Sequence, residues 1–146
     1  MCRNLILIVE DNPDHLELTV LTLEDLGVKA KIVVARDGAE ALDFLFGQGV
    51  YADRDLQQNP CFILLDLKLP KLSGLDVLRS VRSHPHTASV PVIIMTSSSE
   101  LSDMQACYQS GANSFVRKSV DFADFTEKLN LLQGYWLGVN ECLGVV

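Results

Sequence analysis

Two apolar runs of this chain lead directly into acidic residues, and these acids are the first candidates for chemistry. Residues 6–9 run into Glu10 and Asp11, and residues 62–65 run into Asp66. Buried parallel strands read as continuous apolar runs, and an open α/β sheet binds ligands beyond the carboxyl ends of its strands. If the two runs are neighbouring strands, three carboxylates meet at one edge and repel one another. A proton or, more suitably, a hard divalent cation with oxygen ligands would relieve that repulsion.

The length and charge of the chain predict a single acidic domain. The chain has 146 residues, 48% of them hydrophobic, and its 12 basic and 19 acidic residues give a net charge of −7. This length predicts a single domain over residues 1–146. The lack of clustered Lys and Arg argues against binding nucleic acid or an anionic membrane surface. No apolar stretch approaches the ~20 residues that span a bilayer, and acids follow the N-terminal run too soon for a signal peptide. We therefore expect a cytoplasmic protein.

Apolar runs alternate with amphipathic segments five times, which predicts a repeating strand–helix order. We expect strands at residues 5–9, 31–35, 62–66, 92–96 and 114–117. Five such units form a parallel sheet with right-handed crossovers and helices on both faces. The predicted fold class is α/β, a doubly wound, flavodoxin-like sheet of strand order 2-1-3-4-5. That order places the first and third strands side by side, so it brings the three acids together.

The two C-terminal helices carry apolar residues at helical spacing. Met104, Cys107, Tyr108 and Gly111 follow the i, i+3, i+4, i+7 pattern of one helix face. The last helix repeats its apolar residues like a heptad seam, which predicts a stripe that docks on the sheet: Phe122, Phe125, Leu129, Leu132 and Trp136. Residues 48–60 are the one long irregular stretch. They fit an ordered functional loop or a mobile one, and we favour the mobile one.

The predicted topology brings polar side chains from four strand ends to one edge of the sheet. Besides the acids, Thr96 ends the fourth strand and Lys118 follows the fifth. No G-x-S-x-G motif and no histidine at a strand end is present, which argues against a hydrolase. The glycine-rich G-x-G-x-x-G and G-x-x-x-x-G-K-[ST] loops are also absent, so no nucleotide cofactor is expected. Asp11, Thr96 and Lys118 each have an ordinary structural role when taken alone, whereas Asp66 closes a very apolar strand and must find a partner. It is their combination that indicates one chemistry.

Acids, a hydroxyl and a lysine can together receive a phosphoryl group. Asp66 would be the nucleophile and would form an aspartyl phosphate. A magnesium ion held by Glu10, Asp11 and Asp66 would clamp the phosphoryl oxygens. Lys118 would neutralise a further oxygen, and the Thr96 hydroxyl would donate to the third. Such a transfer needs positioning and charge neutralisation more than acid–base chemistry.

Six stretches of the chain connect this chemistry to a known family: residues 7–12, 37–42 and 64–70, Gly74, and residues 91–97 and 111–118. Together they resemble the receiver domain of two-component response regulators. The resemblance covers nearly the whole length and implies that a partner histidine kinase phosphorylates Asp66. It also implies a set of magnesium ligands, namely Glu10, Asp11, Asp66 and the backbone carbonyl of Lys68. Finally, it implies that Thr96 and Phe115 form a switch pair and that Lys118 contacts the phosphate.

Within that family the chain is similar to the small stand-alone regulators of bacterial phytochrome kinases. The similarity lies in the long 48–60 segment, in Lys118-Ser119 and in the tryptophan of the last helix. Proline commonly follows this lysine, often after a cis bond. Because a cis bond before a non-proline residue costs roughly 2.5–4 kcal/mol, the conformation of the Lys118–Ser119 bond is left open. We expect no output domain, so the signal would leave through protein contact.

We expect a homodimer through the surface of the fourth helix, the fifth strand and the fifth helix. Leu131 and Tyr135 adjoin the docking stripe of the last helix, and the following segment is largely apolar through residue 146, with Glu141 as its only charged residue. Exposed apolar patches mark interaction sites, and a symmetric pair is the default for one. The alternative is that Trp136 and the tail fold back and cover their own domain.

Two other functions compete with the phosphorylation switch. A degenerate receiver would bind partners without taking phosphate, but the full set of acids, Thr96 and Lys118 argues against it. A flavin-binding protein of similar topology would need backbone amides after the first strand, where Asp11 instead places negative charge. The sequence therefore favours a signalling switch, which is not an enzyme apart from assisting its own phosphoryl transfer and dephosphorylation.

Overall fold

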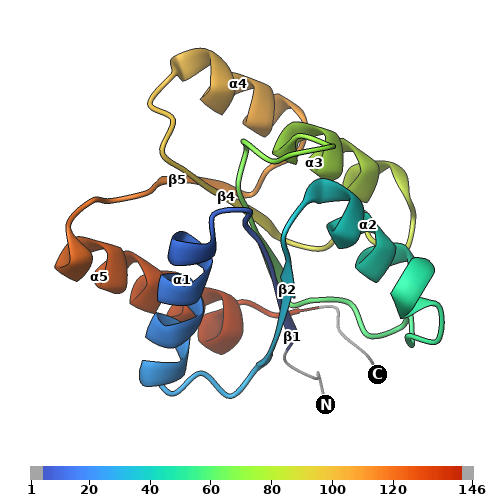
Figure 1. Ribbon diagram of the computed structural model, residues 1–146, viewed down its shortest axis with the longest axis horizontal. Coiled ribbons are helices and arrows are strands. Elements are labelled where there is room, and N and C mark those ends of the chain that lie inside the picture. Colours follow the sequence, from blue (N-terminus) through green and yellow to red (C-terminus); the bar gives the residue numbers. More distant parts are fainter. Residues whose placement is uncertain (1–4, 143–146) are drawn as a thin grey trace.

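The computed structural model describes residues 5–142. Its five strands form one parallel sheet in the order β2-β1-β3-β4-β5, which confirms the predicted topology (Figure 1). The strands are β1 (Leu5–Val9), β2 (Lys31–Ala35), β3 (Phe62–Leu65), β4 (Val92–Thr96) and β5 (Ser114–Arg117). The α-helices are α1 (Pro13–Asp25), α2 (Gly38–Phe46), α3 (Gly74–Ser83), α4 (Leu101–Gln109) and α5 (Phe122–Gln133). No helix within residues 5–142 is long and apolar enough to cross a bilayer.

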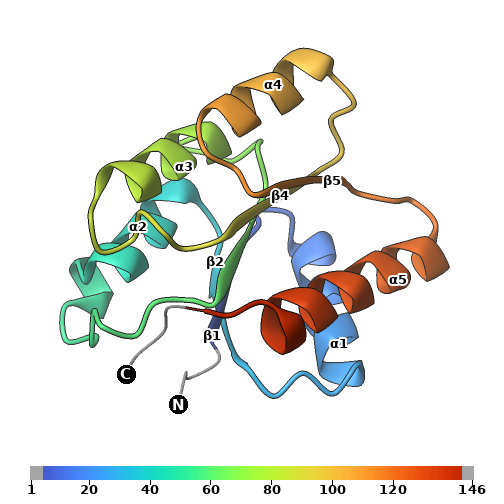
Figure 2. The ribbon, with the colours of Figure 1, turned by 180° about the vertical axis from the view of Figure 1, so that it is seen from behind.

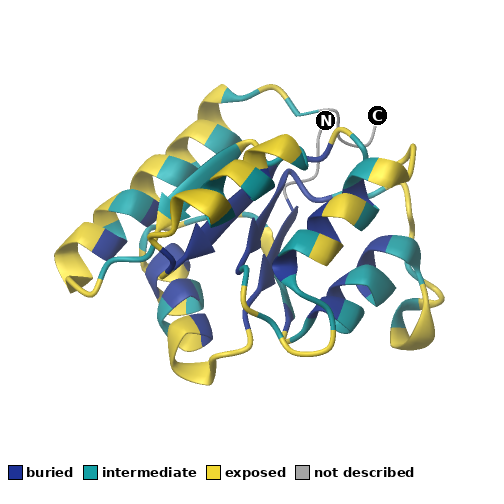
Figure 3. Cartoon of the chain, turned by 90° about the horizontal axis from the view of Figure 1, so that it is seen from above, coloured by how far each residue is buried: buried dark blue, intermediate teal, exposed yellow. Residues whose placement is uncertain are grey.

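The sheet lies between two layers of helices. Helices α1 and α5 cover one face, and α2, α3 and α4 cover the other (Figures 1 and 2). Along β1, Leu5, Leu7 and Val9 pack toward α2 and α3, whereas Ile6 and Ile8 pack toward α1 and α5. The central strands are buried on both faces (Figure 3), which is why they read as unbroken apolar runs.

Side-chain caps begin helices α1, α2, α3 and α5 after the strand ends, whereas α4 has no side-chain cap. The Asn12 side chain accepts hydrogen bonds from Asp14 N and His15 N, and Pro13 occupies the first turn of α1. Ser73 and Asp76 form a capping box at the start of α3. Next to it, a Cβ on Gly74 would overlap the carbonyl oxygen of Asp66, so α3 begins in direct contact with the end of β3.

Two predicted apolar stripes are narrower than the sequence indicated. On α4 only Cys107 is buried, and Tyr108 is 49% exposed because this helix rests on the edge strand and offers little surface to the core. On α5, Phe125 and Leu129 are buried and Leu132 and Trp136 pack against them. Phe122 is 64% exposed, because it begins the helix beyond the end of β5.

Residues 48–60 contact α2 through aromatic and charged groups. A 3₁₀ turn at Gly49–Tyr51 places the Tyr51 ring edge-on to Phe44, at 5.2 Å between ring centroids. The Arg54 guanidinium lies 4.0 Å from the centroid of the same Phe44 ring, a cation–π contact. After α5 the chain continues as a π-helix over Gly134–Val139. The rest of the apolar tail, residues 143–146, lies outside the described residues.

Candidate functional site

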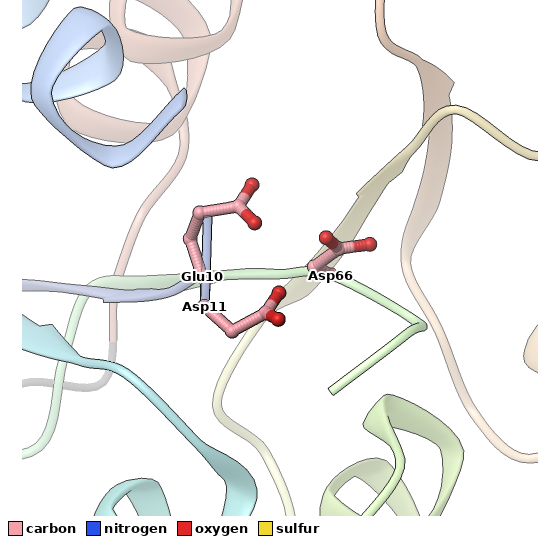
Figure 4. A group of neighbouring side chains, drawn as sticks. All are labelled: Glu10, Asp11 and Asp66. Carbon is pink, nitrogen blue, oxygen red and sulfur yellow. The ribbon is translucent and has the colours of Figure 1, made fainter. Parts of the chain in front are cut away.

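Three carboxylates meet where β1 and β3 end. Glu10 and Asp11 follow β1, Asp66 follows β3, and one oxygen of each lies within 4.8 Å of the others (Figure 4). Glu10 and Asp66 are buried, at 5% and 8% exposure, while Asp11 is exposed. The structure therefore brings together the three acids that the sequence predicted for this edge.

Lys118 reaches this cluster from the segment after β5. Its ammonium donates to Glu10 Oε1 at 2.5 Å and to Asp66 Oδ2 at 3.1 Å. A third contact joins it to Nδ1 of His15 on α1 at 3.3 Å. The backbone holds the lysine in place, because Lys118 N–H donates to the Thr96 carbonyl at 2.7 Å. One cation thus contacts two buried acids directly, a pairing that the sequence did not predict.

The electrostatics of the site favour the charged form of Lys118 and disfavour the charged form of Glu10. Burial raises the pKa of Glu10, and the Asp66 charge raises it further against the opposing effect of Lys118. Burial alone would lower the pKa of Lys118, but its hydrogen bond to Glu10 and the charges of Asp66 and Glu10 outweigh that effect and raise it. Lys118 is therefore a cation at every physiological pH.

Thr96 is buried and connects the site to α4. Its Oγ1 accepts a hydrogen bond from Ser98 N–H at 3.3 Å. The Ser98 hydroxyl donates to Asp103 Oδ2, in the first turn of α4, at 2.6 Å and accepts from Glu100 N–H at 3.2 Å. Sequence reasoning missed Ser98 and Asp103, because a run of three serines gives no sign of which one bonds the helix.

The remaining predicted residues lie around this core. Phe115 pairs with Ile94 of β4 and packs, half-buried, against the α2–α3 side of the sheet. Lys68 N–H lies 3.4 Å from Asp66 Oδ1, and the role of the Lys68 carbonyl as a metal ligand stays a prediction. No peptide bond in the described part of the chain is cis, so Lys118–Ser119 is trans.

The acid cluster suits a hard divalent cation. It offers carboxylate oxygens from three residues, the donors that Mg²⁺ and Mn²⁺ take, and no sulfur or imidazole nitrogen belongs to the cluster. Lys118 supplies one positive charge against three carboxylates, so a bound cation would neutralise negative charge that Lys118 leaves uncompensated. The donor set therefore fits the metal that the sequence predicted.

Comparison with known proteins gives the family. The response regulator receiver domain family matches residues 6–130. The chain is 36% identical to the probable methanogenesis regulatory protein FilR2 of Methanothrix harundinacea, over 96% of this chain and 88% of that protein. It is 32% identical to response regulator Rcp1 of Synechocystis, over 90% and 88%. The chain therefore belongs to the response regulator receiver domain family.

Solved structures narrow the resemblance to regulators of phytochromes. The phosphorylated cyanobacterial phytochrome response regulator RcpA is 30% identical with a TM-score of 0.90, over 97% of this chain and 99% of that one. The bacteriophytochrome response regulator AtBRR is 44% identical with a TM-score of 0.76, over 96% of each chain. The Mn²⁺-bound form of Rcp1 is 30% identical with a TM-score of 0.87, over 95% and 98%.

Proposed function

We propose that this receiver domain is a signalling switch that accepts a phosphoryl group on Asp66 and passes the signal on by protein contact. The observation that carries the proposal is the position of Asp66. Its carboxylate is buried, lies beside Glu10 and Asp11, and accepts a hydrogen bond from Lys118. Glu10 shares this burial and the contact with Lys118, so the choice of Asp66 rests also on its place directly after β3, within the stretch 64–70 that resembles receiver domains. The similarity to phosphorylated RcpA supports the same chemistry.

In the proposed transfer, an Asp66 oxygen attacks the phosphorus of a phosphohistidine. The phosphorus–nitrogen bond breaks, and its electron pair returns to the imidazole of the donor protein. Glu10, Asp11, Asp66 and the carbonyl of Lys68 would hold Mg²⁺, which when bound neutralises charge on the phosphoryl oxygens. Lys118 exchanges its contact with Asp66 Oδ2 for a phosphoryl oxygen, and the Thr96 hydroxyl donates to another.

The direct test is the mass of the protein after incubation with Mg²⁺ and acetyl phosphate. Wild type should gain one phosphoryl group, mapped to Asp66, whereas Asp66→Asn should gain none. Asp53→Asn, which changes an exposed acid remote from the strand ends, is the control and should label like wild type. Labelling of Asp66→Asn, or wild-type labelling at another residue, would refute the proposal. No labelling of wild type by any donor would favour the phosphate-independent interaction module.

We propose a histidine kinase of the bacterial phytochrome class as the donor. The names of RcpA and AtBRR, which link those proteins to phytochromes, support this choice. A cavity of about 330 Å³ beside Lys118, between α1 and the start of α5, gives an approach to the site. Exposed Val120 lines it and exposed Phe122 follows. Phosphotransfer from a panel of purified kinases tests the choice, and transfer only from kinases of other classes would contradict it.

We also propose a homodimer through the surface formed by α4, β5 and α5. Leu131 and Tyr135 are 63% and 49% exposed on α5 and its extension. They border a groove of about 360 Å³ that Val116 and Trp136 also line. An exposed apolar groove of this kind is typical of an interface, and a second copy of the chain is the simplest occupant.

A further inference from the structure

A tyrosine on α4 holds the backbone of the predicted switch residue. The Phe115 N–H donates to the Tyr108 hydroxyl at 3.2 Å. Strand β5 is the last strand of the sheet, and alternate residues of a parallel strand direct their N–H groups to the same neighbour. Because Lys118 N–H points to β4, where it meets the Thr96 carbonyl, Phe115 N–H points away from the sheet. Tyr108 therefore takes up a hydrogen-bonding group on the open edge.

The opposite helix contacts the same edge. Lys128 on α5 donates from Nζ to the Arg117 carbonyl at 2.9 Å. Side chains of α4 and α5 thus occupy backbone groups that an open strand edge would otherwise offer to another chain. Protection of the edge explains both contacts, but it does not explain why the residue held by Tyr108 is Phe115.

Helix α4 is in fact connected to both residues of the predicted switch pair. At its start, Asp103 bonds Ser98, whose N–H donates to Thr96 Oγ1. At its end, Tyr108 bonds the backbone of Phe115. A rearrangement of Thr96 and Phe115 therefore acts on α4 at two points. The link at Tyr108 is a single exposed hydroxyl, which one substitution removes without disturbing the core.

We propose that Tyr108 is a positioning residue of the switch, whose hydroxyl stabilises the arrangement in which Lys118 bonds both Glu10 and Asp66. The inference rests on the proposed function. A phosphoryl group on Asp66 takes Lys118 and the Thr96 hydroxyl as partners, and Phe115 responds by moving. A ligand shifts such an equilibrium only by its different contacts in the two arrangements. In this proposal the Tyr108–Phe115 bond, which holds the Phe115 backbone, is lost when Phe115 moves, so removal of the hydroxyl makes the second arrangement easier to reach.

Tyr108→Phe removes only the hydroxyl, and Tyr135→Phe is its matched control. Both tyrosines are 49% exposed, and the Tyr135 hydroxyl forms no hydrogen bond with another residue of 5–142. The first measurement is the amide hydrogen exchange of Phe115 by NMR without metal. Exchange should be about 2- to 10-fold faster in Tyr108→Phe, as expected for one solvent-accessible hydrogen bond, and unchanged in Tyr135→Phe.

The second measurement is a beryllofluoride titration in Mg²⁺, followed by the same amide signals. Tyr108→Phe should reach half-saturation at about 2- to 10-fold lower beryllofluoride than wild type or Tyr135→Phe. Equal half-saturation in the three proteins, or a higher value for Tyr108→Phe, would overturn the inference while leaving the receiver function intact. If wild type itself shows no binding at Asp66, the proposed function fails, and the role of Tyr108 in it fails with it.

Discussion

The ammonium of Lys118 lies 2.5 Å from Glu10 Oε1 and so joins the end of β1 to the segment after β5. The Glu10 and Lys118 side chains are only 7% and 13% exposed. A buried ion pair adds little net stability, but removal of one partner is costly because it leaves the other charge buried. The pair therefore couples the integrity of the fold to the charge balance of the site.

Replacement of Lys118 by Met should destabilise the metal-free protein by about 2–4 kcal/mol, because Glu10 and Asp66 lose their shared cation. Mg²⁺ should restore most of that loss. Urea unfolding with EDTA and with Mg²⁺ measures both effects. Lys71→Met is the control, since Lys71 is 67% exposed in its ion pair with Asp37 and should cost less than about 1 kcal/mol. Equal losses in the two variants would contradict the prediction.

The raised pKa of Glu10 predicts a pH dependence with a definite sign. A carboxyl whose pKa is raised in the folded protein contributes stability below its unfolded pKa and loses it as pH rises through the folded pKa. Burial raises the pKa of Glu10 above its ordinary 4.5, so metal-free wild type should lose stability relative to Glu10→Gln above that pH. Urea unfolding across a pH series measures the difference. A difference that is constant, or that grows in favour of wild type, would disprove this effect.

Thr96→Ala should still accept a phosphoryl group on Asp66 but respond weakly to it. The variant lacks the hydroxyl that would donate to the phosphoryl group and that accepts the Ser98 N–H. Intact mass measures phosphorylation, and the beryllofluoride-induced shift of the Phe115 amide measures the response. Thr22→Ala removes another buried hydroxyl, on α1, and should respond like wild type. A full response in Thr96→Ala would show that the switch does not depend on this residue.

Leu131→Asp should weaken the proposed homodimer at least about 10-fold, because it places a charge in the apolar interface. Sedimentation velocity across micromolar concentrations gives the dissociation constant. Val50→Asp, at another exposed apolar residue of the α2–β3 segment, is the control and should dimerise like wild type. If wild type is a strict monomer both before and after phosphorylation, the homodimer is refuted, and the α4–β5–α5 surface would instead bind the kinase or another partner.

Much of the fold follows from local sequence patterns. The central strands were predictable because burial on both faces requires unbroken apolar runs. The alternation of strands and helices predicts a doubly wound parallel sheet, and the order 2-1-3-4-5 that this chain has is one of the two common orders of such sheets. Once that order is chosen, β1 and β3 are neighbours and Glu10, Asp11 and Asp66 meet at one edge.

Long-range side-chain contacts were not predictable in the same way. Arg82 on α3 donates to the carbonyls of Ala88, Val90 and Gly111 and to Asn113 Oδ1, and so binds α3 to the segments that flank β4. Its partners are mostly backbone oxygens, which every residue has, so no sequence pattern marks them. The same holds for Tyr108, which the helical spacing placed on an apolar face and the structure places on a backbone amide.

Gly74, at the start of α3, packs directly against the backbone of Asp66, the candidate phosphoacceptor. Its N–H donates to the Leu67 carbonyl at 2.8 Å, and any side chain there would collide with the Asp66 backbone. Opposite, Thr96 and Phe115 are connected to α4 by side-chain hydrogen bonds, which can exchange partners at small cost. The two helices beside the site therefore differ: α3 is in close backbone contact with Asp66, whereas α4 is connected to the predicted switch pair only through side-chain hydrogen bonds. We therefore expect a change at Asp66 to be transmitted to α4, at the edge of the sheet, rather than to α3.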